Sequence, residues 1–379
     1  MATVEGVFWL SVFGVVYPYL GYPAVLWVLG HFFRQKRQCE SGDAYFYPSV
    51  SMIIPVCNEE SRIERKMANT ESLRYPTDRL QVLFVSDGST DRTVELIRKR
   101  AHGTVTLVER PVRRGKAAAL NAGLEHAKHD ILVFTDAAIE LEPDALRNIV
   151  QGFRDPAIGC ISGEDKIAES GGEAWYGRYE LLVRRLESKV HSIVGASGSF
   201  YAQRREICVP FVEGMAPDFL SVLRTVEQGF RAVSEPGAVG TMTSVKDSKQ
   251  EFERKVRTLI RGMTALFSYA QVLNPLRFGI FAIEMLSHKV FRWLVPFFLI
   301  TALFSSVMLV ESPWFLLFAT VQIIFYLIAF LAFSEWSAIR HSLPGKVALY
   351  FSVVNAAILV AWLKYVKGVR QELWTPSQR

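Results

Sequence analysis

Three apolar segments of this sequence each end in a cluster of polar side chains. Acids, amides and hydroxyls at such positions can bind a polar ligand or a cation. Ser89 or Thr90 could also cap the next helix and Gly88 could make the turn, but capping does not explain an acid at Asp87. The three clusters are Cys57-Asn58-Glu59-Glu60, Asp87-Gly88-Ser89 and Thr135-Asp136.

A fourth polar segment, Arg113-Arg114-Gly115-Lys116, opens a predicted helix over Lys116–Ala127. A flexible glycine, a helix N-terminus and a cation together suit contacts with phosphate or beside a nucleobase. The alternative is a basic turn that only faces solvent.

The elements that carry these clusters alternate between short apolar strands and helical segments. Helices are expected before about Leu73, from Thr90, over Lys116–Ala127 and from Pro143. This alternation predicts a doubly wound α/β sheet, which binds ligands at the carboxyl ends of its strands, so the clusters should share one crevice. The predicted strands are Ser49–Pro55, Leu80–Val85, Thr104–Val108 and Asp130–Thr135.

Composition places part of the chain in a membrane. Of the 379 residues, 50% are hydrophobic and 21% charged, too apolar for an ordinary soluble protein and too charged for a wholly embedded one. A bilayer span needs about 20 apolar residues, so three uncharged runs qualify and the fourth is marginal. The first run is too long for a signal-peptide core and is predicted to be a retained anchor. The runs are Gly6–Phe33, Trp293–Val310, Ser312–Ser334 and Val347–Trp362.

The net charge of +6 does not indicate nucleic-acid binding, because the basic residues form no arm or tract. Many flank the apolar runs, as Arg37 and Lys289 do, which predicts a cytoplasmic location for residues 34–292. Three later spans would put Lys364 and Lys367 outside, so either the tail breaks this rule or the last segment does not cross fully. Four widely spaced cysteines are expected to be free thiols. The predicted divisions are an N-terminal transmembrane helix at 1–33, a catalytic domain at 45–245, amphipathic or interfacial helices at 246–292, transmembrane helices at 293–366 and a tail at 367–379.

Several motifs in order resemble the membrane-embedded branch of the family 2 inverting glycosyltransferases, which make hyaluronan, poly-N-acetylglucosamine and other exopolysaccharides. The resemblance implies a GT-A fold, a Rossmann-like α/β domain with a parallel-rich sheet, together with transmembrane and interfacial helices. It is close over about residues 49–300. The motifs are IIPVCNEE, VSDGSTD, RRGKAAALNAG, VFTDAAIELEPDAL, GASGSFYAQRR, PDF, EFERKVRTLIRG, SHKVFRW and the terminal W-x-P-x-x-R.

The resemblance implies a UDP-sugar donor. Asp87 matches the carboxylate that accepts a hydrogen bond from uracil, and Lys116 lies where a cation meets the phosphates. Asp136 matches the first acid of a DxD-type motif that holds Mg²⁺ or Mn²⁺ on the donor phosphates. Ala138 replaces the second acid, so phosphates and water would complete the metal shell. The first nucleotide-contacting loop is matched by Pro55, Asn58 and Glu59.

The resemblance also implies a catalytic base, Asp218, which takes the proton of the acceptor hydroxyl. Pro217 replaces the preceding acid of the motif and suits the first turn of a helix through Val226. The alternative role for Asp218 is an acid favoured near a helix N-terminus. The small residues Gly195, Ser197 and Gly198 would let the backbone approach the sugar or acceptor.

Arg254, Arg257 and Arg261 form one stripe of a predicted helix. In processive relatives QxxRW stands at Arg254–Thr258, so the arginine is kept at Arg257 while the glutamine and tryptophan are not. Arg254 and Arg257 are assigned to the donor diphosphate, and the alternative is a basic face against lipid headgroups.

The sequence therefore predicts a multi-pass cell-membrane glycosyltransferase with a cytoplasmic catalytic domain and membrane lipid around its helices. It would transfer a sugar with inversion to a growing polysaccharide. The alternatives are transfer of one sugar to a lipid-linked acceptor, or a non-catalytic partner subunit with a degenerate sugar-nucleotide domain.

Overall fold

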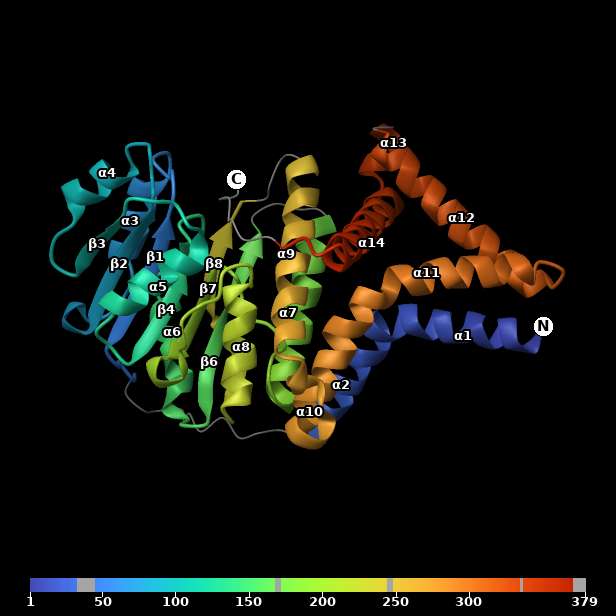
Figure 1. Ribbon diagram of the computed structural model, residues 1–379, viewed down its shortest axis with the longest axis horizontal. Coiled ribbons are helices and arrows are strands. Elements are labelled where there is room, and N and C mark those ends of the chain that lie inside the picture. Colours follow the sequence, from blue (N-terminus) through green and yellow to red (C-terminus); the bar gives the residue numbers. More distant parts are fainter. Residues whose placement is uncertain (33–44, 168–171, 244–247, 335–336, 371–379) are drawn as a thin grey trace.

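The computed structural model describes residues 1–32, 45–167, 172–243, 248–334 and 337–370. Their strands form one eight-stranded sheet in the order β3-β2-β1-β4-β7-β6-β8-β5, with helices on both faces and a group of long helices to one side (Figure 1). The strands are β1 (Val50–Val56), β2 (Leu80–Asp87), β3 (Val105–Arg110), β4 (Ile131–Thr135), β5 (Glu140–Leu141), β6 (Ile158–Ile167), β7 (Phe200–Arg204) and β8 (Arg231–Met242).

The half of the sheet formed by β3, β2, β1 and β4 is parallel, as predicted. Every residue of β1 is buried, because helices cover both faces of the sheet, and this explains its continuous apolar sequence. The predicted end of β2 at Val85 is wrong by two residues, since Ser86 and Asp87 still belong to the strand. The carboxyl ends of β1, β2 and β4 therefore lie along one edge.

The other half of the sheet is mixed. Strand β7 pairs antiparallel with both β4 and β6, while β6 and β8 run parallel with irregularities around Gly159 and Gly163. The short strand β5 pairs antiparallel with β8. The reversal at β4–β7 brings the start of β7 beside the end of β4, and the backbone N–H of Asp136 donates to Ser199 O at 3.0 Å.

Helices cover both faces of the sheet, so this region has three layers. One core joins the sheet to α5 and α8, through Ile53 and Leu120, and continues through Ile260 and Ile358 into α9 and α14 (Leu343–Val366). The opposite core joins the sheet to α3, α4 and α6. The helices of this region are α3 (Ile63–Glu71), α4 (Thr93–Arg100), α5 (Lys116–His126), α6 (Ala145–Gln151), α7 (Gly172–Val190), α8 (Pro217–Glu227) and α9 (Ser248–Ser268), with 3-10 turns at Thr77–Arg79, Gly152–Arg154, Arg205–Ile207 and Ala270–Leu273.

Four helical segments of the described residues are long and apolar enough to cross a membrane: 2–32, 275–308, 313–333 and 343–366. The second begins 18 residues before Trp293, the predicted start of the C-terminal spans. Helices α1 and α11 lie side by side, and α14 packs on α9 (Figure 1). The helices are α1 (Ala2–Val16), π-helix η1 (Tyr17–Gly21), α2 (Tyr22–Phe32), α10 (Pro275–Met285), π-helix η6 (Leu286–Val290), α11 (Phe291–Met308), α12 (Pro313–Phe333), α13 (Ser337–His341) and α14 (Leu343–Val366).

Candidate active site

Asp87, the last residue of β2, holds the basic turn that precedes α5. Its side chain is almost fully buried, and its oxygens accept backbone N–H groups from Arg114 at 3.1 and 3.2 Å and from Gly115 at 2.6 Å. Gly115 has a φ of +97°, which favours glycine. A carboxylate has about four acceptor positions, so Asp87 can still accept from a ligand. Asp87 thus ties the basic turn to the strand end.

The loop after β1 is joined to the loop after β2. Asn58 has a left-handed φ of +54°; its Oδ1 accepts from Thr90 N at 2.8 Å, and its N–H donates to Ser89 Oγ at 3.3 Å. The predicted cap at Ser89 or Thr90 is wrong, because α4 begins at Thr93. The Asp91 carboxylate accepts the Thr93 N–H at 3.0 Å instead. These bonds join the two loops into one wall.

Two buried charged groups lie behind this wall. Glu59 is 6% exposed and its Oε2 is 3.2 Å from Arg62 Nε, yet burial raises the pKa of Glu59 to about 7. Lys66 donates to Ile139 O at 2.7 Å and Thr135 Oγ1 at 3.2 Å, and burial lowers its pKa to about 7. The sequence reasoning missed Lys66, whose only signal was a lysine on a helix that covers the sheet. Pro55 lies inside β1 and pairs in register with Val85.

Lys116 joins two of the predicted subsites. Its Nζ lies 2.5 Å from Asp136 Oδ1 and donates to Gly198 O at 2.9 Å. Asp136 follows β4 and Gly198 precedes β7, so the reversal of strand direction makes this contact possible. The structure thus brings the predicted phosphate cation, metal ligand and acceptor segment to one point.

Asp218 lies on the other side of Gly198. A Cβ built on Gly198 would be 3.7 Å from Asp218 Cγ, and among the described residues no group donates a hydrogen bond to the Asp218 carboxylate. Helix α8 begins at Pro217, as predicted, and has no side-chain cap, so Asp218 does not cap it. This partly exposed carboxylate faces the acceptor segment.

The acceptor segment is held by Ser197. Its Oγ donates to Asp165 Oδ1 at 2.5 Å and accepts the N–H of Ser199 at 3.1 Å and of Phe200 at 2.9 Å. Ser197 is buried, so its side chain shapes the turn and the backbone is what a ligand can reach. Asp165 therefore positions this segment.

The arginine stripe lies on α9 as predicted. Arg254 forms a two-pronged ion pair with Glu251, at 2.7 Å for both contacts. Burial lowers the pKa of Arg257, with Arg254 contributing, and burial also lowers that of Arg261, which donates to Met215 O at 2.7 Å. The charges of Asp218 and Arg257 act electrostatically on Arg261. Arg261, the last residue of the stripe, therefore borders the Asp218 side of the site.

The predicted metal site has one protein acid. Within the described ranges, no three His, Cys, Asp or Glu side chains are grouped closely enough to hold a metal ion. Asp136 is partly exposed, and Ala138 supplies no ligand. Mg²⁺ commonly uses one or two carboxylates plus substrate phosphates. Asp136 thus fits a metal that binds together with a donor.

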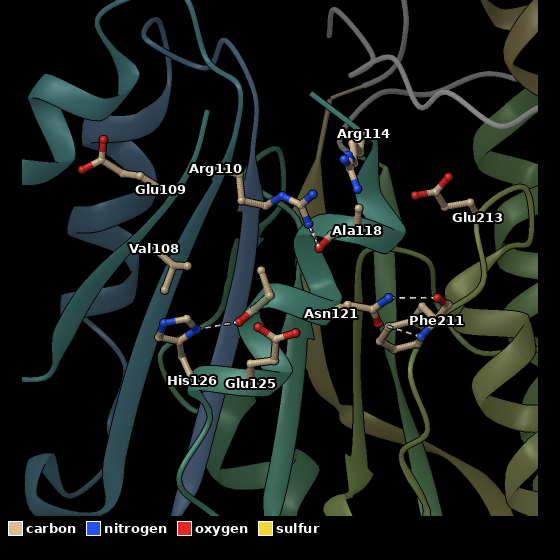
Figure 2. Close-up of a pocket in the computed structure, with 11 residues that line it drawn as sticks. Val108, Glu109, Arg110, Arg114, Ala118, Asn121, Glu125, His126, Phe211 and Glu213 are labelled. Atoms are coloured by element: carbon tan, nitrogen blue, oxygen red, sulfur yellow. Dashed lines mark hydrogen bonds between the residues drawn. The ribbon is translucent and has the colours of Figure 1, made fainter. Parts of the chain in front are cut away.

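Figure 2 shows a pocket on the outer side of the basic turn, between β3, α5 and the segment near Phe211. Asn121 holds its far wall by exchanging hydrogen bonds with the backbone of Phe211, at 2.9 and 2.7 Å. Arg110 lines the pocket and also lies 3.6 Å from Asp87 Oδ1. The pocket includes Arg114 of the basic turn, but none of the other residues predicted to contact the donor.

Comparison with known proteins agrees with this geometry. Residues 51–209 match the family described as "Glycosyl transferase family 2". The poly-beta-1,6-N-acetyl-D-glucosamine synthase of Staphylococcus aureus is 31% identical over 120 residues, which cover 31% of this chain and 29% of that protein. The same enzyme of Staphylococcus epidermidis is 25% identical over 169 residues, covering 42% of this chain and 40% of that protein. The chain thus matches less than half of each relative's length.

A solved mannosyltransferase from Pyrobaculum calidifontis, in complex with GDP-Man and Mn²⁺, superimposes with a TM-score of 0.71. It is 23% identical, and the match covers 96% of this chain and 99% of that one. The sheet and its polar edge define a mixed α/β fold of the GT-A type. The chain carries a glycosyltransferase family 2 domain within residues 51–209.

Proposed function

We propose that this protein is a membrane glycosyltransferase that transfers a sugar, with inversion, from a UDP-sugar to a growing exopolysaccharide. The observation that carries the proposal is the contact of Lys116 with both Asp136 and Gly198, beside Asp218. A transferase must hold a donor diphosphate next to an acceptor hydroxyl, and these four residues bring such groups together.

The donor would be bound along the edge formed by β1, β2 and β4. Asp87 would accept from the nucleobase and also keep the Arg114–Lys116 turn in place for the phosphates. Lys116 and Arg257 would supply positive charge to the diphosphate. The loop with Asn58 and Glu59 would close the nucleotide side, and Pro55 would fix the strand below it.

Asp136 would hold Mg²⁺ or Mn²⁺ together with the donor phosphates. Such an ion neutralises charge on the leaving diphosphate. Because the protein supplies one carboxylate, metal and donor should bind cooperatively, and neither should bind tightly alone. The solved mannosyltransferase contains Mn²⁺.

Asp218 would accept the proton of the acceptor hydroxyl. The acceptor oxygen then forms a bond to the anomeric carbon while the bond from that carbon to the diphosphate oxygen breaks, and the diphosphate leaves with the electron pair. Attack opposite the leaving group inverts the anomeric configuration. Gly198 leaves room for the acceptor, since no side chain stands between its backbone and Asp218.

The acceptor would be a polysaccharide, as the matched synthases indicate by name. Transfer of one sugar to a lipid-linked acceptor is the second candidate, favoured by Thr258 in place of the tryptophan of QxxRW. The catalytic domain would face the cytoplasm, where nucleotide sugars are made, with the four apolar segments in the cell membrane.

The test is to incubate the purified full chain in liposomes with radiolabelled UDP-sugars, and with GDP-mannose as the comparison donor. Products are then sized by gel and mass spectrometry. A ladder supports polymer synthesis, and a single lipid-bound sugar supports the second candidate. Donor binding without turnover would indicate a non-catalytic subunit, and no nucleotide binding would refute the proposal.

A further inference from the structure

Lys289 extends from the membrane-side helices to the predicted acceptor segment. It lies in η6, within the candidate span Pro275–Met308. Its Nζ is 5.6 Å from the ring centroid of Phe219, the residue that follows Asp218. A Cβ built on Gly195 would be 3.5 Å from the same Nζ. A cation from the membrane region therefore borders the space beside the predicted base.

The acids near Lys289 are engaged by other groups. Glu187 Oε1 lies 2.5 Å from His288 Nδ1 and accepts from Tyr22 OH at 2.8 Å. Glu180 pairs with Arg292 and lies 3.3 Å from His288 Nε2. Both acids act electrostatically on Lys289, but neither lies close to it, because Lys289 forms no ion pair within 4.0 Å with any residue that the structure describes. Its contact is the face of Phe219.

A second cation, Arg184, acts on Lys289 and is linked to the acceptor segment. Arg184 is among the charged groups that act on Lys289, and its Nη1 donates to Ser162 Oγ at 3.3 Å. The same Ser162 oxygen accepts the N–H of Ser197 at 2.8 Å, so Arg184 is tied to the acceptor segment. Two cations therefore flank this segment on its membrane side.

We propose that Lys289 binds the phosphate of a lipid-linked acceptor whose hydroxyl faces Asp218; this rests on the proposed transferase activity and favours the second candidate acceptor. An ionisable group within a span marks a candidate ligand path, and a phosphate is the anion that a membrane lipid brings to that depth. A neutral glycan would bring no anion to this lysine. The contact with Gly195 and Phe219 places Lys289 beside the acceptor segment rather than on the lipid-facing surface.

Binding can be measured without turnover. The full chain in detergent is titrated with farnesyl phosphate and with farnesol, in the presence and absence of UDP. We expect the wild type to bind farnesyl phosphate about tenfold or more tightly than farnesol, the usual scale of a charge-assisted contact. Lys289→Gln should lose this preference, while Lys289→Arg should keep most of it. The matched control is Lys364→Gln, an exposed lysine at the end of α14, which should behave as the wild type does.

Three results would overturn the assignment. One is a wild type without the preference, and another is a Lys289→Gln variant that retains it. The third is equal competition by phosphatidylglycerol or glucuronic acid, which would indicate a general headgroup site or a uronate site. UDP affinity is measured on the same preparation, so a failure of the proposed function appears as lost UDP binding, while the farnesyl phosphate preference still decides the role of Lys289.

Discussion

The two ends of the candidate site differ in how the protein holds its carboxylates. Asp87, on the nucleotide side, is 1% exposed and accepts backbone N–H groups from Arg114 and Gly115. Asp218, on the transfer side, is partly exposed and receives no hydrogen bond from any described residue. The proposed nucleotide side is thus fixed before a ligand binds, whereas the proposed transfer side keeps a carboxylate to which no described residue donates a hydrogen bond.

Replacing Asp218 should have the largest effect on the transfer rate. Asp218→Asn keeps the shape and removes the proton acceptor, so we expect the transfer rate to fall by about 10²–10⁴-fold. UDP affinity should stay close to wild type and the melting temperature should fall only slightly, because no described residue donates a hydrogen bond to this carboxylate and its interaction with Arg261 is electrostatic. The three quantities are measured on one preparation. A folded variant that transfers sugar within tenfold of wild type would remove Asp218 from the mechanism, and Asp165 would be tested next.

Replacing Asp87 should weaken UDP binding and also lower the stability of the fold. Asp87→Ala removes the acceptor of the backbone N–H groups of Arg114 and Gly115 as well as the proposed contact with uracil. Losing a hydrogen bond to a charged group costs about 1.5–3 kcal/mol, so UDP affinity in calorimetry should fall roughly 10- to 150-fold. We also expect a lower melting temperature, unlike for Asp218→Asn. Unchanged UDP affinity with lowered stability would make Asp87 purely structural.

A third change adds an acid beside Asp136, the proposed metal ligand. Ala138 is partly exposed, so Ala138→Asp can place a second carboxylate near Asp136. We expect UDP to bind with half-saturation at roughly tenfold lower Mn²⁺, because the ion gains a protein ligand. Binding is followed with and without EDTA. Full wild-type turnover in EDTA would exclude metal dependence, and an unchanged Mn²⁺ requirement in the variant would argue against Asp136 as a ligand.

The last prediction concerns Glu59, the buried acid on the proposed nucleotide side. Burial raises the pKa of Glu59 from 4.5 to about 7, so the folded protein keeps a proton that the unfolded chain releases. Stability should therefore decline as pH rises from about 4.5 to 7, by about 3 kcal/mol at most. Glu59→Gln should remove this decline, seen as a smaller loss of melting temperature between pH 5 and 7.5. The control is Glu71→Gln, which changes an exposed acid at the end of α3 and should follow wild type.

The parallel half of the sheet could be predicted from the sequence. Its strands are buried on both faces, so β1 and β2 appear as continuous apolar runs between helical segments. Strands β6 and β8 carry polar residues such as Glu164 and Glu235 and pair with irregular register, so no clear period marks them. Their pairing depends on residues far apart in the chain.

The same limit applies to the site. The polar strand ends were visible because each follows an apolar run directly. That Lys116 would meet Gly198, or that Asp87 would hold Gly115, depends on how β4 and β7 pair and how the turn folds back. The sequence indicates only a membrane-flanking cation at Lys289, because charge next to an apolar run does not reveal which way a side chain extends.

The core shared by α9 and α14 has a consequence for biosynthesis. Ile260 on α9 packs in the same cluster as Ala357, Ile358 and Ala361 on α14. The ribosome makes α14 about 100 residues after α9, which takes on the order of ten seconds. Until α14 inserts, the apolar face of α9 lacks its cover, so the nascent chain would need a chaperone or the lipid surface to shield it. A chain that ends before Leu343 should aggregate during synthesis even though it contains every residue of the two joined loops after β1 and β2.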